Sequence, residues 1–215
     1  MASAAIDQDA ITTQYDRVAP FYRALSPLFL INPLARRRGV AALGLRPGDT
    51  VLEVAVGTGR NLSYLVDAVG PTGTVIGVDL SAGMLREAAK LVERRGWRNV
   101  ELIEGDATKL DLDRALDAIF FSLAWSVIPA PVTALSRIWD RLCPGGRVAV
   151  MEISLAETYL RPVLAPIGRQ LNKLGPGRPD ARPWDDLAPF GEVVTTRFLH
   201  LFYVCSVEKR GTPGR

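Results

Sequence analysis

The sequence predicts an α/β fold in which helices cover both faces of a mostly parallel sheet. Between residues 50 and 153, short apolar segments alternate with helical segments at the spacing of βαβ units. These strand segments are almost continuously apolar, which is typical of strands that are buried on both faces. Near the C-terminus two more strand-like segments are joined by a short connection, which predicts an antiparallel hairpin.

The individual elements follow from β-branched runs, turn residues and helical periodicity. Expected strands cover residues 50–56, 74–79, 99–104, 116–122, 147–153, 192–198 and 201–208. Expected helices cover residues 33–43, 60–69, 81–95 and 131–142, with Ser81 as the N-cap of the third. Glycine and proline place turns at residues 70–73 and 144–146. Residues 161–189 contain six prolines and three glycines, which predicts an irregular helix-and-loop insert.

Composition excludes several classes of protein. The chain has 215 residues, of which 48% are apolar, so it suits a single folded domain rather than a disordered chain. Its two cysteines form no CxxC pair, which favours a reducing compartment without disulfides or a metal cluster. The sequence shows no secretory signal and no uncharged apolar run near the roughly 20 residues of a spanning helix. We therefore expect a cytoplasmic protein, and a net charge of +3 does not by itself predict nucleic-acid binding.

Three features belong at the carboxyl ends of the strands, where open α/β sheets bind their ligands. The first is Glu53 followed by the glycine turn 57–59, where the backbone can approach a ligand closely. The second is Asp79, placed to accept hydrogen bonds from a ribose diol. The third is the turn 105–107, whose acid is placed to accept from an adenine amino group. Each feature also has a simpler interpretation. The first could be an ordinary strand–helix turn, the second an acid that stabilises the N-terminus of a helix, and the third a plain turn.

Taken together, these features resemble the class I S-adenosylmethionine (SAM)-dependent methyltransferases. The residues that carry the resemblance are VLEVAVGTG (51–59), VIGVDLSAGML (75–85), VELIEGDA (100–107) and LCPGGRVAVMEI (142–153). The resemblance implies a Rossmann-like sheet of seven strands whose last strand is antiparallel, with SAM as the cofactor. It also implies a division into an N-terminal helical lid or membrane-proximal segment, residues 1–45, and a SAM-binding methyltransferase domain, residues 46–215.

The same resemblance implies which part of SAM each segment contacts. Residues 57–59 would line the methionine moiety with support from Glu53, and Asp79 would hold the ribose hydroxyls. Leu80 and Met84 would pack on the adenine, and Asp106 with Ala107 would flank its exocyclic amine. The expected cofactor contacts are Tyr15, Glu53, Gly57, Thr58, Gly59, Asn61, Asp79, Leu80, Met84, Gly105, Asp106, Ala107, Ser122 and Leu123. One departure is Ala55, where many members of the family have glycine, so that a methyl group narrows the pocket slightly.

Two further segments indicate which molecule accepts the methyl group. Residues 15–22 resemble the opening of bacterial phosphatidylethanolamine and betaine-lipid N-methyltransferases and of ubiquinone/menaquinone C-methyltransferases, and Tyr22 is an expected acceptor contact. Trp125 is a second expected acceptor contact, because it lies in a stretch that resembles the lipid N-methyltransferases. The alternative role for Trp125 is packing in the core. Apolar residues 25–34 before three arginines suit a segment on an anionic membrane, although the pattern favours a lid helix followed by a solvated basic face.

The scarcity of bases favours methylation of an amine or a preactivated acceptor, and the resemblance implies a phosphatidylethanolamine-type lipid headgroup or a similar amine, with the protein at the inner face of the membrane. The one histidine, His200, is expected to be structural, and no metal site is expected. The alternative is C- or O-methylation of a quinone-like or natural-product molecule, which usually needs a base. A dinucleotide cofactor is disfavoured because Leu62 occupies the third glycine position of GxGxxG. A nucleic-acid-binding module and a catalytically silent SAM-binding protein are further alternatives.

Overall fold

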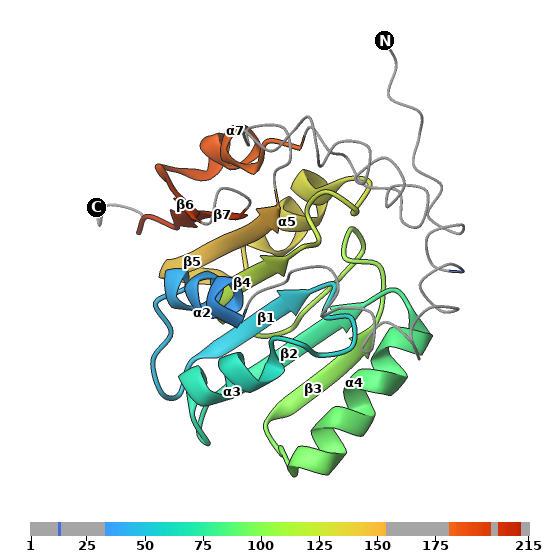
Figure 1. Ribbon diagram of the computed structural model, residues 1–215. Coiled ribbons are helices and arrows are strands. Elements are labelled where there is room, and N and C mark those ends of the chain that lie inside the picture. Colours follow the sequence, from blue (N-terminus) through green and yellow to red (C-terminus); the bar gives the residue numbers. More distant parts are fainter. Residues whose placement is uncertain (1–12, 14–32, 154–180, 199–201, 212–215) are drawn as a thin grey trace.

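A computed structural model describes residue 13 and residues 33–153, 181–198 and 202–211. Seven strands form one sheet in the order β3-β2-β1-β4-β5-β7-β6 (Figure 1). The strands are β1 (Thr50–Val54), β2 (Thr74–Asp79), β3 (Val100–Glu104), β4 (Leu116–Ser122), β5 (Leu142–Ile153), β6 (Val193–Phe198) and β7 (Phe202–Glu208). The first five pair in parallel, and β7 lies antiparallel to both β5 and β6. The predicted α/β fold and the terminal hairpin are therefore confirmed.

Helices cover both faces of this sheet. The helices are α2 (Pro33–Ala42), α3 (Leu62–Val69), α4 (Ala82–Arg95), α5 (Pro131–Trp139), α7 (Pro183–Leu187) and a short 3-10 helix (Ala188–Phe190). Strand β4 shows the two layers, because its side chains alternate: Phe120 packs with α2, α3 and α4, whereas Phe121 packs with α5 and α7. None of the helices in the described part of the chain has the length and hydropathy that crossing a bilayer requires.

Local sequence explains where several elements begin and end. Helix α4 begins as predicted, since the Ser81 hydroxyl accepts a hydrogen bond from the backbone N–H of Met84 at 3.1 Å. Strand β1 is two residues shorter than predicted, because Ala55 adopts a positive φ of 57° and leaves the extended conformation. The expected turn at residues 144–146 lies within β5 instead, where the pairing with β4 shifts register between Leu116 and Ala118.

Four expectations fall on residues outside the described ranges. They are the lid helix with Tyr15 and Tyr22, the apolar segment at residues 25–32, His200, and most of the irregular insert. The expected domain boundary at residue 45 also stays a prediction.

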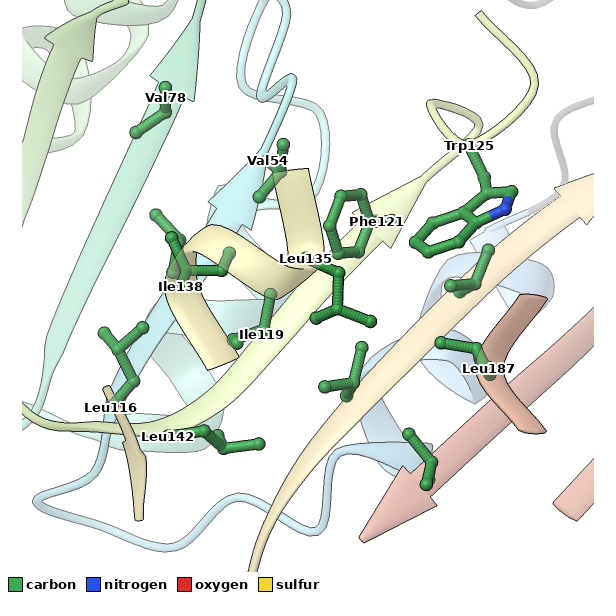
Figure 2. Close-up of a cluster of buried hydrophobic side chains, with 14 of the residues drawn as sticks. Val54, Val78, Leu116, Ile119, Phe121, Trp125, Leu135, Ile138, Leu142 and Leu187 are labelled. Atoms are coloured by element: carbon green, nitrogen blue, oxygen red, sulfur yellow. The ribbon is translucent and has the colours of Figure 1, made fainter. Parts of the chain in front are cut away.

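Phe121 and Trp125 are the two aromatic residues labelled in the larger apolar cluster (Figure 2). Both side chains are fully buried, and their rings meet edge to face with centroids 4.9 Å apart. The indole N–H of Trp125 donates to a carboxylate oxygen of Asp186 at 2.8 Å, so the polar atom of this buried ring is satisfied. The cluster thereby links the end of β4 to α5 and α7, and it holds the carboxyl edge of the sheet rigid.

Truncation of Phe121 tests this packing. Phe121→Ala should lower the free energy of unfolding by about 3–5 kcal/mol, because it removes a fully buried ring and leaves a cavity. Urea denaturation measures the change. Val194→Ala is the matched control: the side chain of Val194 is 59% exposed on β6, so its loss should cost less than about 0.5 kcal/mol. Equal effects of the two substitutions would contradict the assigned core.

Candidate functional site

A cavity opens at the carboxyl ends of β1, β2 and β4, where the order of the strands reverses. Its empty volume is about 1080 Å³ when the open mouth is included. The sequence predicted many of its lining residues: Glu53, Gly57, Thr58, Asn61, Asp79, Leu80, Met84, Gly105, Asp106, Ala107, Ser122 and Leu123. The lining residues that were not predicted include Arg36 and the segment 127–129.

The Asp79 carboxylate at the end of β2 organises the turn that follows β1. One of its oxygens accepts a hydrogen bond from the Gly57 N–H at 2.7 Å, and the other accepts from the Ser81 N–H at 2.9 Å. Gly57 and Gly59 both have positive φ, 56° and 77°, a conformation that glycine adopts without a steric penalty. The carboxylate therefore fixes the glycine turn against the start of α4, and the turn forms one wall of the cavity.

A chain of polar groups lies beneath this wall. Arg36 on α2 donates to the Asn61 side-chain oxygen at 2.6 Å, and the Asn61 amide nitrogen donates in turn to a carboxyl oxygen of Glu53. All three side chains are buried. Burial raises the pKa of Glu53 to about 8, while the Asn61 hydrogen bond and the Arg36 charge act in the opposite direction.

Three buried side-chain polar atoms in the described part of the chain have no hydrogen-bond partner. They are Glu53 Oε2, Thr58 Oγ1 and Ser122 Oγ. All three residues line this one cavity. An unpaired buried polar atom is costly, and native proteins contain few of them. Their concentration here indicates polar groups of a ligand that would complete the hydrogen bonds.

The segment after β4 forms an apolar wall of the cavity, beside Ser122. It contributes Leu123, which has a positive φ of 56°, and the residues Val127, Ile128 and Pro129. This wall is held from behind by Glu152 at the end of β5, whose carboxyl accepts from the Ser126 N–H at 3.1 Å and from its hydroxyl at 3.3 Å. Glu152 is buried, and burial raises its pKa to about 7.

Two predicted contacts lie elsewhere in the structure. Trp125 is a core residue and does not line the cavity, because its ring packs on Phe121 and its N–H is bound by Asp186. Gly59 lies just outside the cavity, on the far side of the glycine turn. Tyr15 and Tyr22 lie outside the described residues, so their roles stay predictions.

Sequence reasoning missed Arg36 and Glu152. Arg36 stands in a run of three arginines, which reads as a solvated basic face, and its burial depends on a partner 25 positions away. Glu152 did carry a signal, since it is a charged residue inside an otherwise apolar strand.

The chain is similar in sequence to known methyltransferases. Residues 51–146 match the family model described as "Methyltransferase domain". The demethylmenaquinone methyltransferase of Renibacterium salmoninarum is 33% identical over 159 residues, which are 72% of this chain and 64% of that protein. The protein of the same name from Anoxybacillus flavithermus is 31% identical over 68% of this chain and 63% of its own length. The chain thus spans less than two thirds of these relatives.

Solved structures agree on the fold. A SAM-dependent methyltransferase from Aquifex aeolicus superposes with a TM-score of 0.66 at 22% identity, covering 86% of this chain and 96% of the other. DhpI, solved in complex with S-adenosylhomocysteine (SAH), gives a TM-score of 0.69 at 22% identity over 98% of this chain and 100% of the other. At this identity the likeness establishes the shared Rossmann-like architecture.

Titration of Glu152 should make the stability of the protein depend on pH. The folded protein keeps the carboxyl protonated between its ordinary pKa of 4.5 and about 7, whereas the unfolded chain releases the proton. The free energy of unfolding should therefore fall as the pH rises through this interval. Glu152→Gln should reduce that fall by up to about 3 kcal/mol, and buried Glu53 should account for part of the remainder.

Urea titrations at about pH 5 and about pH 8 measure the effect. Glu93→Gln, on the exposed side of α4, is the control and should keep the full wild-type dependence. A Glu152→Gln protein with that same dependence would show that this carboxyl is already ionised in the folded state.

Proposed function

We propose that this chain, whose residues 51–146 match a methyltransferase domain, is a class I SAM-dependent methyltransferase that binds SAM in the cavity and methylates a quinone-like ring. The observation that carries the proposal is the gathering of three unpartnered buried polar atoms in one cavity at the reversal of strand order. A nucleoside that carries an amino acid supplies hydrogen-bonding groups at both of its ends. An apolar ligand would leave the three atoms unsatisfied.

The methionine end of SAM suits the side of the cavity near β1. Its ammonium group would donate to Glu53 Oε2, which the Asn61 hydrogen bond leaves available for a ligand. Thr58 Oγ1 would donate to the carboxylate of the same moiety. A cation next to Glu53 favours the ionised carboxyl, so it would lower the pKa that burial has raised.

The adenosine end suits the side near β2 and α4. Each oxygen of the Asp79 carboxylate accepts a hydrogen bond from one backbone N–H, and a carboxylate oxygen can accept more than one hydrogen bond, so Asp79 would also accept from a ribose hydroxyl. Leu80 and Met84 would pack on the adenine, beside the turn at residues 105–107. The ribose site is thus formed by the same carboxylate that fixes the glycine turn.

SAM supplies an activated methyl group when it is bound, and the residues of the chain provide position and an apolar enclosure. Bound SAM would supply the methyl group to a nucleophilic atom of the acceptor and would leave as SAH, while the acceptor would lose a proton to water or buffer. Ser122 and Leu123 stand at the end of β4, where the sulfonium side of the cofactor would lie.

The apolar wall favours a ring over a charged headgroup. Leu123, Val127, Ile128 and Pro129 offer dispersion contacts to an aromatic face and no partner for an ammonium group. The names of the sequence relatives point the same way, since each is called a demethylmenaquinone methyltransferase. They support the quinone alternative and not the lipid-headgroup amine that the sequence favoured. Association with a membrane surface, which would give access to an apolar quinone, stays a prediction.

A methyl-transfer assay with labelled SAM separates the two acceptors. A demethylated naphthoquinone kept reduced should take up label, because its hydroquinone ring carbon is electron-rich enough to attack the methyl group. Vesicles of phosphatidylethanolamine should take up none. Label in the phospholipid and not in the naphthoquinone would overturn the proposed acceptor while leaving the cofactor site in place.

Loss of the Asp79 charge tests the cofactor site directly. Asp79→Asn should weaken SAH binding by about tenfold or more, since a charge-assisted hydrogen bond to the ribose contributes about 1.5–3 kcal/mol. Calorimetric titration measures the affinity, and thermal melting confirms that the variant is folded. Asp67→Asn, on the exposed side of α3, is the control and should bind SAH as the wild type does. A folded Asp79→Asn protein with undiminished affinity would place the ribose elsewhere.

A further inference from the structure

A second depression lies on the other side of the glycine turn. It is bounded by the start of α2, the first turn of α3 and the C-terminal half of α4, and it adjoins the cavity at Arg36, Thr58 and Arg60. Its polar and aromatic lining residues are Arg36, Thr58, Arg60, Ser63, Tyr64, Arg95 and Trp97. None of these residues except Arg36, Thr58 and Arg60 also lines the cavity that we assign to SAM.

The charged side chains that line this depression are all arginines. Arg36 comes from α2, Arg60 from the turn before α3, and Arg95 from the last turn of α4. No aspartate or glutamate of the described residues lines it. Arg36 is 7% exposed, and the hydrogen bond from its guanidinium to Asn61 fixes the position of that group. Arginines from three separate elements therefore line one small space.

The first turn of α3 adds to this positive potential. Asn61 stands at the N-cap position, but its side chain makes no capping hydrogen bond because Glu53 and Arg36 engage its amide. Ser63 and Tyr64 of this first turn line the depression. The N–H groups of Leu62 and Tyr64 donate to the carbonyl oxygens of Gly59 and Asn61, so this turn contributes only the partial positive charge of a helix N-terminus.

Thr58 lies at the boundary between the cavity and the depression. Its side chain is 2% exposed, its hydroxyl has no hydrogen-bond partner, and the residue lines both spaces. A hydroxyl has a single hydrogen to donate, so with SAM bound Thr58 offers a ligand in the depression only its acceptor sites.

We propose that this depression is a binding site for a phosphoryl group, separate from the SAM cavity. A phosphoryl group offers three oxygens and close to two negative charges, which suits guanidinium groups that approach from three directions. A carboxylate is planar and would engage fewer of them. The side chain of Trp97, with the Arg95 guanidinium 6.0 Å from its ring centroid, leaves an apolar flank for whatever carries the phosphate.

Inorganic phosphate is the probe, titrated calorimetrically into protein that is already saturated with SAH in a phosphate-free buffer. The wild type should bind phosphate saturably, and Arg95→Gln should weaken the binding about tenfold or more. Arg94→Gln is the matched control: Arg94 is the adjacent arginine of α4, is exposed and does not line the depression. It should retain the wild-type affinity. Both substitutions should leave SAH binding unchanged, so failure of this proposal is distinguishable from failure of the SAM site.

A second arm identifies the source of the phosphoryl group. Sedimentation with phosphatidylcholine vesicles that contain phosphatidic acid, lost in Arg95→Gln and kept in Arg94→Gln, would assign the site to a lipid headgroup. Phosphate binding without such sedimentation would assign it to a free phosphate or phosphate ester. The proposal is overturned if the SAH-saturated wild type binds no phosphate, or if the two arginine substitutions weaken binding equally. The latter result would indicate only a diffuse basic surface.

Discussion

The carboxylate of Asp79 is the contact on which the geometry of the candidate site depends. It joins two backbone N–H groups, one in the turn after β1 and one at the start of α4. The parallel pairing of β1 with β2 brings these segments to the same edge of the sheet, and the carboxylate fixes how the turn lies on that edge. With the turn fixed, Thr58 separates two concave surfaces, and Asn61 reaches back to Glu53. One side chain thus sets the position of residues on both sides of the turn.

The site contains strained and unsatisfied groups, and the packing of the core has to offset their cost in free energy. Ala55 and Leu123 are the two non-glycine residues of the described chain with positive φ, and both line the cavity. The left-handed conformation costs such residues about 1–2 kcal/mol each. Buried Glu53 and the unpartnered hydroxyls add to this cost. The strain and the unsatisfied atoms lie beside well-packed strands, as is typical of functional sites supported by a rigid framework.

The fold and half of the site could be predicted from sequence because their signals are local. Strand β2 ends in an acid and is followed by a serine cap, so Asp79 and Ser81 were found from a few consecutive residues. Trp125, Arg36 and Glu152 show the limit. Their roles depend on partners 61, 25 and 26 positions away, and the sequence gives no sign of these pairings. The sequence showed that Ala55 departs from the family pattern, but it did not show the positive φ of this residue. The backbone conformation at the end of a strand depends on the turn that follows.

The acceptor and the proposed phosphoryl group would approach different sides of the same turn. The apolar wall of Leu123 and Val127 faces the cavity from β4, whereas Arg60 and Arg95 face the depression from the side of α3 and α4. An apolar ring and a phosphate need opposite surroundings, because the ring gains from exclusion of water and the phosphate from concentrated positive charge. The two environments meet at the glycine turn, where Arg36, Thr58 and Arg60 line both. A ligand in the depression would therefore contact the turn that holds the cofactor without entering the space in which the methyl group is transferred.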